Sequence, residues 1–262
     1  ILDSKARFHP VISETGMVVS QEIIASRVGA DILSVGGNAV DAAVATGFAL
    51  AVTLPRAGNL GGGGFMLVHL AEADKTIAID YREMAPAEAH RDMFLDREGD
   101  VDNQKARYSI ESSGVPGTVA GLIHAQEKYG LLTLKQVMQP AIELARGGFT
   151  VSADLADSLM ARGERLQKHP VTKAYFFKPQ GAFYQRGEQL VQADLGATLS
   201  RIASAGREGF YQGKTADLII AQMEDSGGLI THQDLLNYQV VERQPVCGLF
   251  RVTKVCTMPP PS

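Results

Sequence analysis

Residues 58–70 read GNLGGGGFMLVHL, four consecutive glycines followed by an apolar run. A dinucleotide-binding loop needs a strand before its glycines and a helix after them, and here the expected order is reversed. A Walker-type phosphate loop also needs a lysine after its last glycine, and none follows Gly64. We therefore interpret the glycines as a place of close backbone approach, where another chain segment or a ligand lies against the loop.

Two helices are expected before this loop. Apolar residues repeat at helical spacing through residues 20–35, and Ser20 is expected to cap that helix while Gly36 and Gly37 end it. Asn38 is expected to cap a second helix over residues 39–52. That helix is apolar nearly all round, which predicts a buried position at the centre of the fold.

Two strands are expected after the loop, over residues 65–70 and 76–81, joined by a polar turn. The first is continuously apolar, which is typical of a strand covered on both faces. His69 inside it is interpreted as a core histidine. The order helix, helix, strand, strand predicts a layered α/β fold, and we find no domain boundary within 1–262.

The rest of the chain is expected to be mostly helical. A capping box at 133–136 starts one helix, and Pro140 is expected to break it into two short ones. The segment 243–262 is expected to return to strands. Further helices are expected at 116–130, 153–162, 194–205, 215–225 and from 231 onward.

Composition excludes several classes of function. The net charge is −4 and the basic residues are scattered, which argues against nucleic-acid binding. The longest apolar stretch, 42–54, is too short to cross a bilayer. The six histidines form no H-x-x-x-H or H-E-x-x-H pair, so we expect no metal and no cofactor.

The chain has two cysteines, Cys247 and Cys256. If 245–250 and 253–258 form a hairpin, the two side chains would face each other. A disulfide in an oxidising compartment and two free thiols both stay open from the sequence.

Arg82 stands out among the charged residues because it follows the end of a buried strand, where sites usually lie in layered α/β folds. A guanidinium there could bind a substrate carboxylate through two parallel hydrogen bonds. The alternative is a structural ion pair with Asp80 or Glu83. The residue pattern alone leaves both readings open.

Several segments together resemble the γ-glutamyltransferases (γ-glutamyltranspeptidases), which belong to the N-terminal nucleophile hydrolases. They cover nearly the whole chain in the order of the family. They are GMVVS (16–20), GGNAVDAAVA (36–45), AGNLGGGGFM (57–66), DYREMAPA (80–87), GVPGTVAG (114–121), QPAIELARGGF (139–149), GGLIT (227–231) and MPPPS (258–262).

The resemblance implies a four-layer αββα sandwich within one domain, completed by a small subunit that self-cleavage of a proenzyme releases. The new N-terminal threonine of that subunit would attack γ-glutamyl compounds such as glutathione and pass the glutamyl group to water or an amino acid. Residues 1–262 look like the N-terminal part of the large subunit, so no catalytic residue is expected in this chain. The family also implies export to the periplasm or the cell exterior. A chain that begins at Ile1 and not at Met is compatible with processing.

The arginine of the family's REMAP motif binds the α-carboxylate of the glutamyl group, and the resemblance assigns this role to Arg82. Glu83 is expected, more weakly, to orient it. The four glycines are expected to make room for the backbone of the small subunit, so Gly62→Val should impair maturation. Two alternatives stay open: a cephalosporin-acylase-like enzyme that takes glutaryl groups, and a non-catalytic scaffold.

Overall fold

The computed structural model describes residues 12–261, and its central feature is an antiparallel three-stranded sheet in the order β1-β2-β5. Strand β1 (Gly64–Leu70) pairs with β2 (Lys75–Tyr81) along its full length, from Gly64 opposite Tyr81 to Leu70 opposite Lys75. Strand β5 (Val241–Arg243) adds three residues on the far side of β2. The two strands expected from the sequence are confirmed within one residue at each end.

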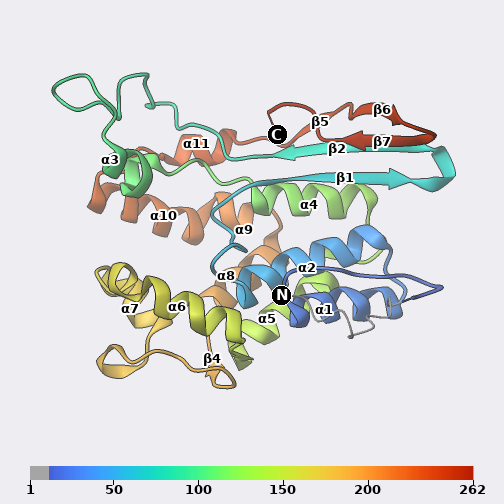
Figure 1. The fold of residues 1–262 in the computed structure, drawn as a ribbon, viewed down its shortest axis with the longest axis horizontal. Coiled ribbons are helices and arrows are strands. Elements are labelled where there is room, and N and C mark those ends of the chain that lie inside the picture. The colour runs from blue at the N-terminus through green and yellow to red at the C-terminus, as the bar shows by residue number, and fades with distance from the viewer. Residues whose placement is uncertain (1–11, 262) are drawn as a thin grey trace.

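The helices form layers beneath this sheet (Figure 1). Helix α4 (Thr118–Tyr129) packs on β1 and β2, α2 (Ala39–Thr53) packs on α4, and α1 (Ile23–Ser34) and α5 (Leu134–Gly147) pack on α2. The remaining helices are α3 (Asn103–Tyr108), α6 (Ala153–Leu166), α7 (Pro170–Phe176), α8 (Ala193–Ala205), α9 (Glu208–Tyr211), α10 (Gly213–Ser226) and α11 (His232–Asn237). Short 3-10 turns lie at Ala71–Ala73, Ile110–Ser112 and Pro179–Gly181, and two small sheets are formed by β3 (Phe149–Thr150) with β4 (Gln189–Leu190) and by β6 (Val246–Phe250) with β7 (Thr253–Thr257).

Helix α2 is central and buried, as its apolar sequence predicts, and Asn38 caps it together with Asp41. The carboxylate of Asp41 is fully buried, and it joins the start of α2 to the end of α4. It accepts hydrogen bonds from Gln126 Nε2 (2.6 Å) and from the backbone N–H groups of Asn38, Leu131 and Leu132. Burial alone raises the pKa of Asp41, but these hydrogen bonds outweigh it and hold the pKa below its usual value.

The expected cap of α1 is wrong. The helix begins after Glu22, whose carboxylate accepts from Ala25 N at 2.8 Å. The hydroxyl of Ser20 is engaged instead with Glu22 O and with Ser26 Oγ. A longer side chain therefore satisfies the helix N-terminus, because Ser20 lies two residues before the cap position.

The break expected at Pro140 is also wrong, since α5 runs without interruption from Leu134 to Gly147. The helix has buried residues on both sides of the proline, including Met138 and Ala141, and it packs against α2 and α8. Tertiary packing on two neighbours offsets the one backbone hydrogen bond that proline cannot make.

Strand β1 is not covered on both faces by the described residues. Val68 is buried against the helices, but Leu67 on the opposite face is 42% exposed. His69 shares that outer face, is exposed, and contacts Thr76 Oγ1 through Nδ1 at 3.1 Å. It is therefore not a core histidine. The apolar run correctly predicts the strand, and within the described residues one of its two faces is covered, while a cover for the second face stays a prediction.

The C-terminal strands form the hairpin that the cysteines suggested. Cys247 lies opposite Cys256 in the β6–β7 register, and the two form a disulfide with a Cα–Cα distance of 4.1 Å. The hairpin is rich in exposed apolar side chains, namely Val246, Leu249, Phe250, Val252 and Val255. In the view of Figure 1 it lies above β2.

None of the helices in 12–261 has the length and apolar character required to cross a membrane.

Candidate functional site

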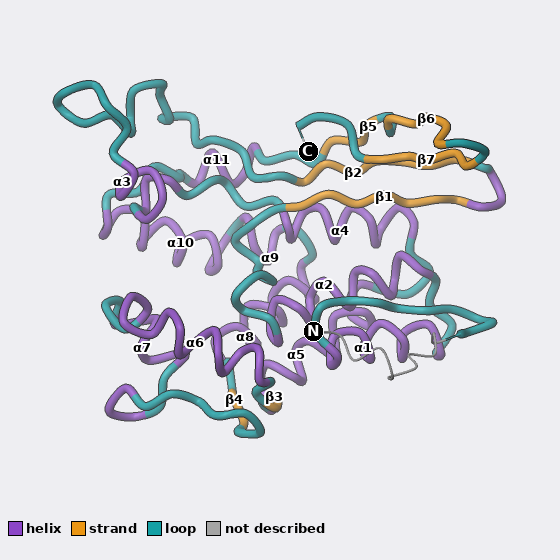
Figure 2. Tube along the Cα trace, viewed as in Figure 1, coloured by secondary structure: helices purple, strands orange, loops and turns teal. Residues whose placement is uncertain are grey.

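Arg82 is the first residue beyond the β1–β2 ladder, which ends at the pair Gly64–Tyr81. From here the chain enters the long connection to α3, which Figure 2 shows projecting away from the helices. Both backbone polar groups of Arg82 are held by side chains. Its N–H donates to Asp80 Oδ1 at 3.1 Å, and its carbonyl accepts from the Tyr238 hydroxyl at 2.9 Å.

Glycines pack around this strand end from two sides. A Cβ on Gly63 would lie 2.6 Å from both Tyr81 O and Glu83 N, and one on Gly64 would lie 2.8 Å from the Tyr81 ring. From the other side, Gly117 and Gly121 lie against the carbonyl and the ring of Tyr81. Only residues without a Cβ allow such an approach, so the glycines fix the position of the strand end.

The glycine loop itself is bound to the start of α4. The carbonyl of Gly62 accepts from the backbone N–H groups of Gly117 (2.7 Å) and Thr118 (2.9 Å). The expectation of close backbone approach is therefore confirmed, and the segment that approaches belongs to the same chain. A role for Gly62 in accommodating a second subunit stays a prediction.

The guanidinium of Arg82 is exposed, and its Nη1 donates to Pro261 O at 2.6 Å. The structural ion pair considered for it is not seen: Asp80 pairs with Arg243, whose Nε lies 2.8 Å from Asp80 Oδ2. Within residues 12–261, no carboxylate forms an ion pair with Arg82. One edge of this guanidinium is thus oriented by a carbonyl, while its charge is not neutralised by the part of the chain that the structure describes.

Glu83, the residue after Arg82, packs against two glycines. A Cβ on Gly63 would come within 2.8 Å of Glu83 Oε2, and one on Gly114 within 2.8 Å of Glu83 Cβ. No hydrogen bond joins the Glu83 side chain to Arg82 within the described chain, so an orienting role for Glu83 stays a prediction.

Two residues of this site, Tyr238 and Pro261, were missed from sequence. They are 156 and 179 residues away from Arg82 in the sequence, and no local pattern around either residue predicts its hydrogen bond with Arg82. The only available signal was that MPPPS, with Pro261, is one of the segments shared with the family.

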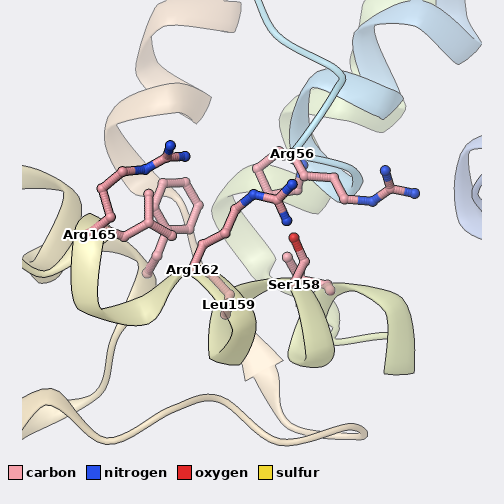
Figure 3. A pocket seen from close by; sticks show the side chains of 9 residues that line it. Arg56, Ser158, Leu159, Arg162 and Arg165 are labelled. Atoms are coloured by element: carbon pink, nitrogen blue, oxygen red, sulfur yellow. The ribbon is translucent and has the colours of Figure 1, made fainter. Parts of the chain in front are cut away.

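A separate pocket of about 300 Å³ lies on α6, lined by Arg56, Ser158, Leu159, Arg162 and Arg165 among others (Figure 3). Arg56 is paired with Asp154 at 2.6 Å, and Arg165 stacks on the Tyr108 ring. No residue that lines it belongs to the Arg82 site. No group of His, Cys, Asp or Glu side chains within the described residues could hold a metal ion.

The fold and the site define a mixed α/β protein whose candidate site is an exposed arginine at the end of a sheet strand. A family model described as gamma-glutamyltranspeptidase matches residues 25–262. The chain belongs to the gamma-glutamyltranspeptidase family.

Individual relatives agree with this assignment. The chain is 53% identical over 256 residues to the glutathione hydrolase proenzyme of Escherichia coli strain K12, covering 97% of this chain and 44% of the relative. It is 35% identical to the acylase ACY 1 proenzyme of Pseudomonas sp. strain V22, covering 100% of this chain and 48% of that protein. The chain thus spans less than half the length of these relatives.

The fold is also that of a solved family member. The crystal structure of Helicobacter pylori gamma-glutamyltranspeptidase matches with a TM-score of 0.94 and 45% identity, over 97% of this chain and 72% of that chain. The gamma-glutamyltranspeptidase fold is therefore established for the described residues.

Proposed function

We propose that this chain is the N-terminal part of the large subunit of a γ-glutamyltransferase, or glutathione hydrolase. The enzyme would cleave γ-glutamyl amides such as glutathione by acyl transfer to water or to an amino acid. The nucleophile would be the N-terminal threonine of the small subunit, with its own α-amino group as the base. The proenzyme relatives and the fold match support this proposal.

Arg82 is proposed to bind the α-carboxylate of the γ-glutamyl group. The observation that carries this is that no carboxylate of residues 12–261 pairs with its guanidinium, which extends from a rigid strand end where Asp80 is already paired to Arg243. A planar cation with a free edge can take a carboxylate through two parallel hydrogen bonds, whereas an ammonium cannot. The long glutamyl chain would then extend from the arginine toward the nucleophile.

We further propose that the small subunit completes a four-layer αββα sandwich. The outer face of β1, which residues 12–261 leave exposed at Leu67 and His69, supports this, because a sheet face with apolar residues is stable when a second layer covers it. The outer edge of β1 pairs with no strand of residues 12–261, which leaves a place for a strand from the partner.

Export to the periplasm or the cell exterior is proposed as well. The Cys247–Cys256 disulfide supports it, since disulfides persist in oxidising compartments and are rare in the cytosol.

The test uses the full-length, self-processed gene product and a γ-glutamyl anilide as substrate. Arg82→Lys keeps the charge but loses the fork, so KM should rise about tenfold or more while kcat changes much less. Arg91→Lys is the matched control, because Arg91 is an exposed arginine of the same connection and, among the described residues, forms an ion pair with the exposed Asp92 alone. An unchanged KM in Arg82→Lys would contradict the proposed role.

A glutaryl acylase is the second candidate, supported by the 35% identity to the acylase ACY 1 proenzyme. Glutaryl and γ-glutamyl groups both carry a distal carboxylate, so Arg82 serves either. Comparing the hydrolysis of γ-glutamyl and glutaryl anilides separates the two. A full-length product that stays one uncleaved band on a gel would instead indicate a non-catalytic scaffold.

A further inference from the structure

We propose that Tyr238 is a positioning residue for Arg82: by holding the main-chain carbonyl of Arg82, it fixes the point from which the guanidinium reaches the substrate carboxylate. This inference rests on the proposed function of Arg82. Tyr238 lies between α11 and β5, the strand that pairs with β2 up to Asp80 and not beyond it.

The contact matters because Arg82 lies just outside the ladder. Strand pairing holds the backbone up to Tyr81, and it resumes further on, where Met84 and Val115 exchange two hydrogen bonds of 3.2 and 2.7 Å. Between these anchors the carbonyl of Arg82 has no backbone donor among the described residues. The hydroxyl of Tyr238 supplies the missing donor at 2.9 Å.

Tyr238 is itself rigidly held. Its side chain is almost fully buried, with 2% of the residue exposed, and its ring stacks on that of Tyr211 with a centroid distance of 5.8 Å and an interplanar angle of 10°. The guanidinium of Arg207 lies over the Tyr211 ring, 4.6 Å from its centroid, and it donates to the carbonyls of Tyr238 and Leu236. A cation and two stacked rings thus form a rigid column beneath Arg82.

The same column also holds the glycine segment that packs against the strand end. The Tyr211 hydroxyl donates to Pro116 O at 2.7 Å and accepts from Ala120 N at 3.2 Å. A Cβ on Gly117 would clash with the Tyr238 hydroxyl and with Tyr81 O. The start of α4, Tyr211 and Tyr238 therefore form one packed unit, and Arg82 is attached to it through a single hydroxyl.

The hydroxyl is a donor throughout the working pH range. Burial raises the pKa of Tyr238, and the neighbouring carboxylates of Asp80 and Glu83 act in the same direction. The phenol therefore stays protonated and can donate a hydrogen bond to the Arg82 carbonyl, which can only accept one.

The test is Tyr238→Phe in the full-length, self-processed protein, because this change removes the hydroxyl and keeps the stacked ring. KM for a γ-glutamyl anilide should rise about fivefold, with kcat within about twofold of the wild type, as expected for the loss of one hydrogen bond that orients a binding group. Tyr175→Phe is the matched control: its hydroxyl likewise donates one hydrogen bond, here to the Asp194 carboxylate, but it lies on α7 and outside this site. It should leave KM unchanged.

A double-mutant cycle tests the positioning role of Tyr238 separately from the substrate-binding role of Arg82. If Tyr238 acts through Arg82, Tyr238→Phe should lower kcat/KM in the wild type and have no further effect in an Arg82→Ala background. Equal loss in both backgrounds, or a wild-type KM in Tyr238→Phe beside a raised KM in Arg82→Ala, would overturn the positioning role alone. If Arg82→Ala itself leaves KM unchanged, the proposed function of Arg82 fails, and this inference fails with it.

Discussion

The Nε of Arg243 lies 2.8 Å from Oδ2 of Asp80, so the Asp80 carboxylate neutralises Arg243 and not Arg82. Asp80 and Arg82 are two residues apart in extended chain, so their side chains share one face. Without Arg243, the Asp80 carboxylate, which already accepts from the backbone N–H of Arg82, would be available to the Arg82 guanidinium. The β2–β5 pairing therefore controls the charge at the candidate site.

Arg243→Ala should weaken both stability and substrate binding. It leaves the nearly buried Asp80 carboxylate without a cation, which should lower the free energy of unfolding by about 1–3 kcal/mol, a range reduced because Arg243 is partly exposed. The freed carboxylate should also compete for Arg82 and raise KM. Urea unfolding and steady-state kinetics measure the two effects. Arg91→Ala breaks only an exposed pair and should change neither; a wild-type KM in Arg243→Ala would show that Asp80 does not reach Arg82.

Gly63→Ala should disturb the strand end. The added Cβ would lie 2.6 Å from two backbone atoms, Tyr81 O and Glu83 N, which cannot rotate away as a side chain can. We expect a loss of about 1–3 kcal/mol in the free energy of unfolding and a raised KM, since Arg82 lies between the two displaced residues. Gly61→Ala is the control, because a Cβ there would meet no atom within 4 Å. Equal stabilities of the two variants would refute the packing argument.

Asp41→Asn should be strongly destabilising. The carboxylate accepts hydrogen bonds from four residues in a site closed to solvent, and an amide offers only one acceptor oxygen while its NH₂ would face backbone N–H groups. We expect a loss of about 2–4 kcal/mol, measurable by thermal or urea unfolding. Asp154→Asn, at a half-exposed ion pair with Arg56, should cost less than 1 kcal/mol by the usual magnitude for surface pairs. Similar losses in the two variants would contradict the proposed importance of the buried network.

Glu242 should make stability depend on acid pH. Partial burial raises its pKa, but hydrogen bonds from Lys128, His124 and Tyr129 outweigh this and lower the pKa from 4.5 to about 2. Since the folded-state pKa is the lower one, the stabilisation is complete above pH 4.5 and is lost as pH falls toward about 2. The difference in free energy of unfolding between wild type and Glu242→Gln should therefore shrink across that window. A difference that stays constant from pH 6 to pH 2.5 would contradict this assignment.

Local sequence patterns predicted the elements whose capping and apolar patterning depend on residues close together in the sequence. The cap of α2 by Asn38, the apolar surface of α2 and the two strands around the polar turn all follow from residues within a few positions of one another. The same reasoning placed Arg82 at a strand end. The features that it missed depend on contacts between residues far apart in the sequence. Helix α5 continues through Pro140 because it packs on α2 and α8. The carbonyl of Arg82 is held by the distant Tyr238.

Short elements were missed for a related reason. Helices α3, α7 and α9 are four to seven residues long, too short for an apolar period to show. The exposure of Leu67 was missed because an apolar run predicts that both faces of a strand are covered. It does not predict which polypeptide segment covers them.

No strand of residues 12–261 pairs with the outer edge of β1, and this has a consequence for the synthesis and folding of the protein. A strand edge that stays open beside exposed apolar side chains such as Leu67 invites pairing with other copies, and so leads to aggregates. If the covering strands are encoded downstream in the same polypeptide, as proposed, they are present in equal number and at millimolar effective concentration during synthesis. Folding would then precede cleavage, and the tether would act as a built-in chaperone that is cut once the sheet is closed.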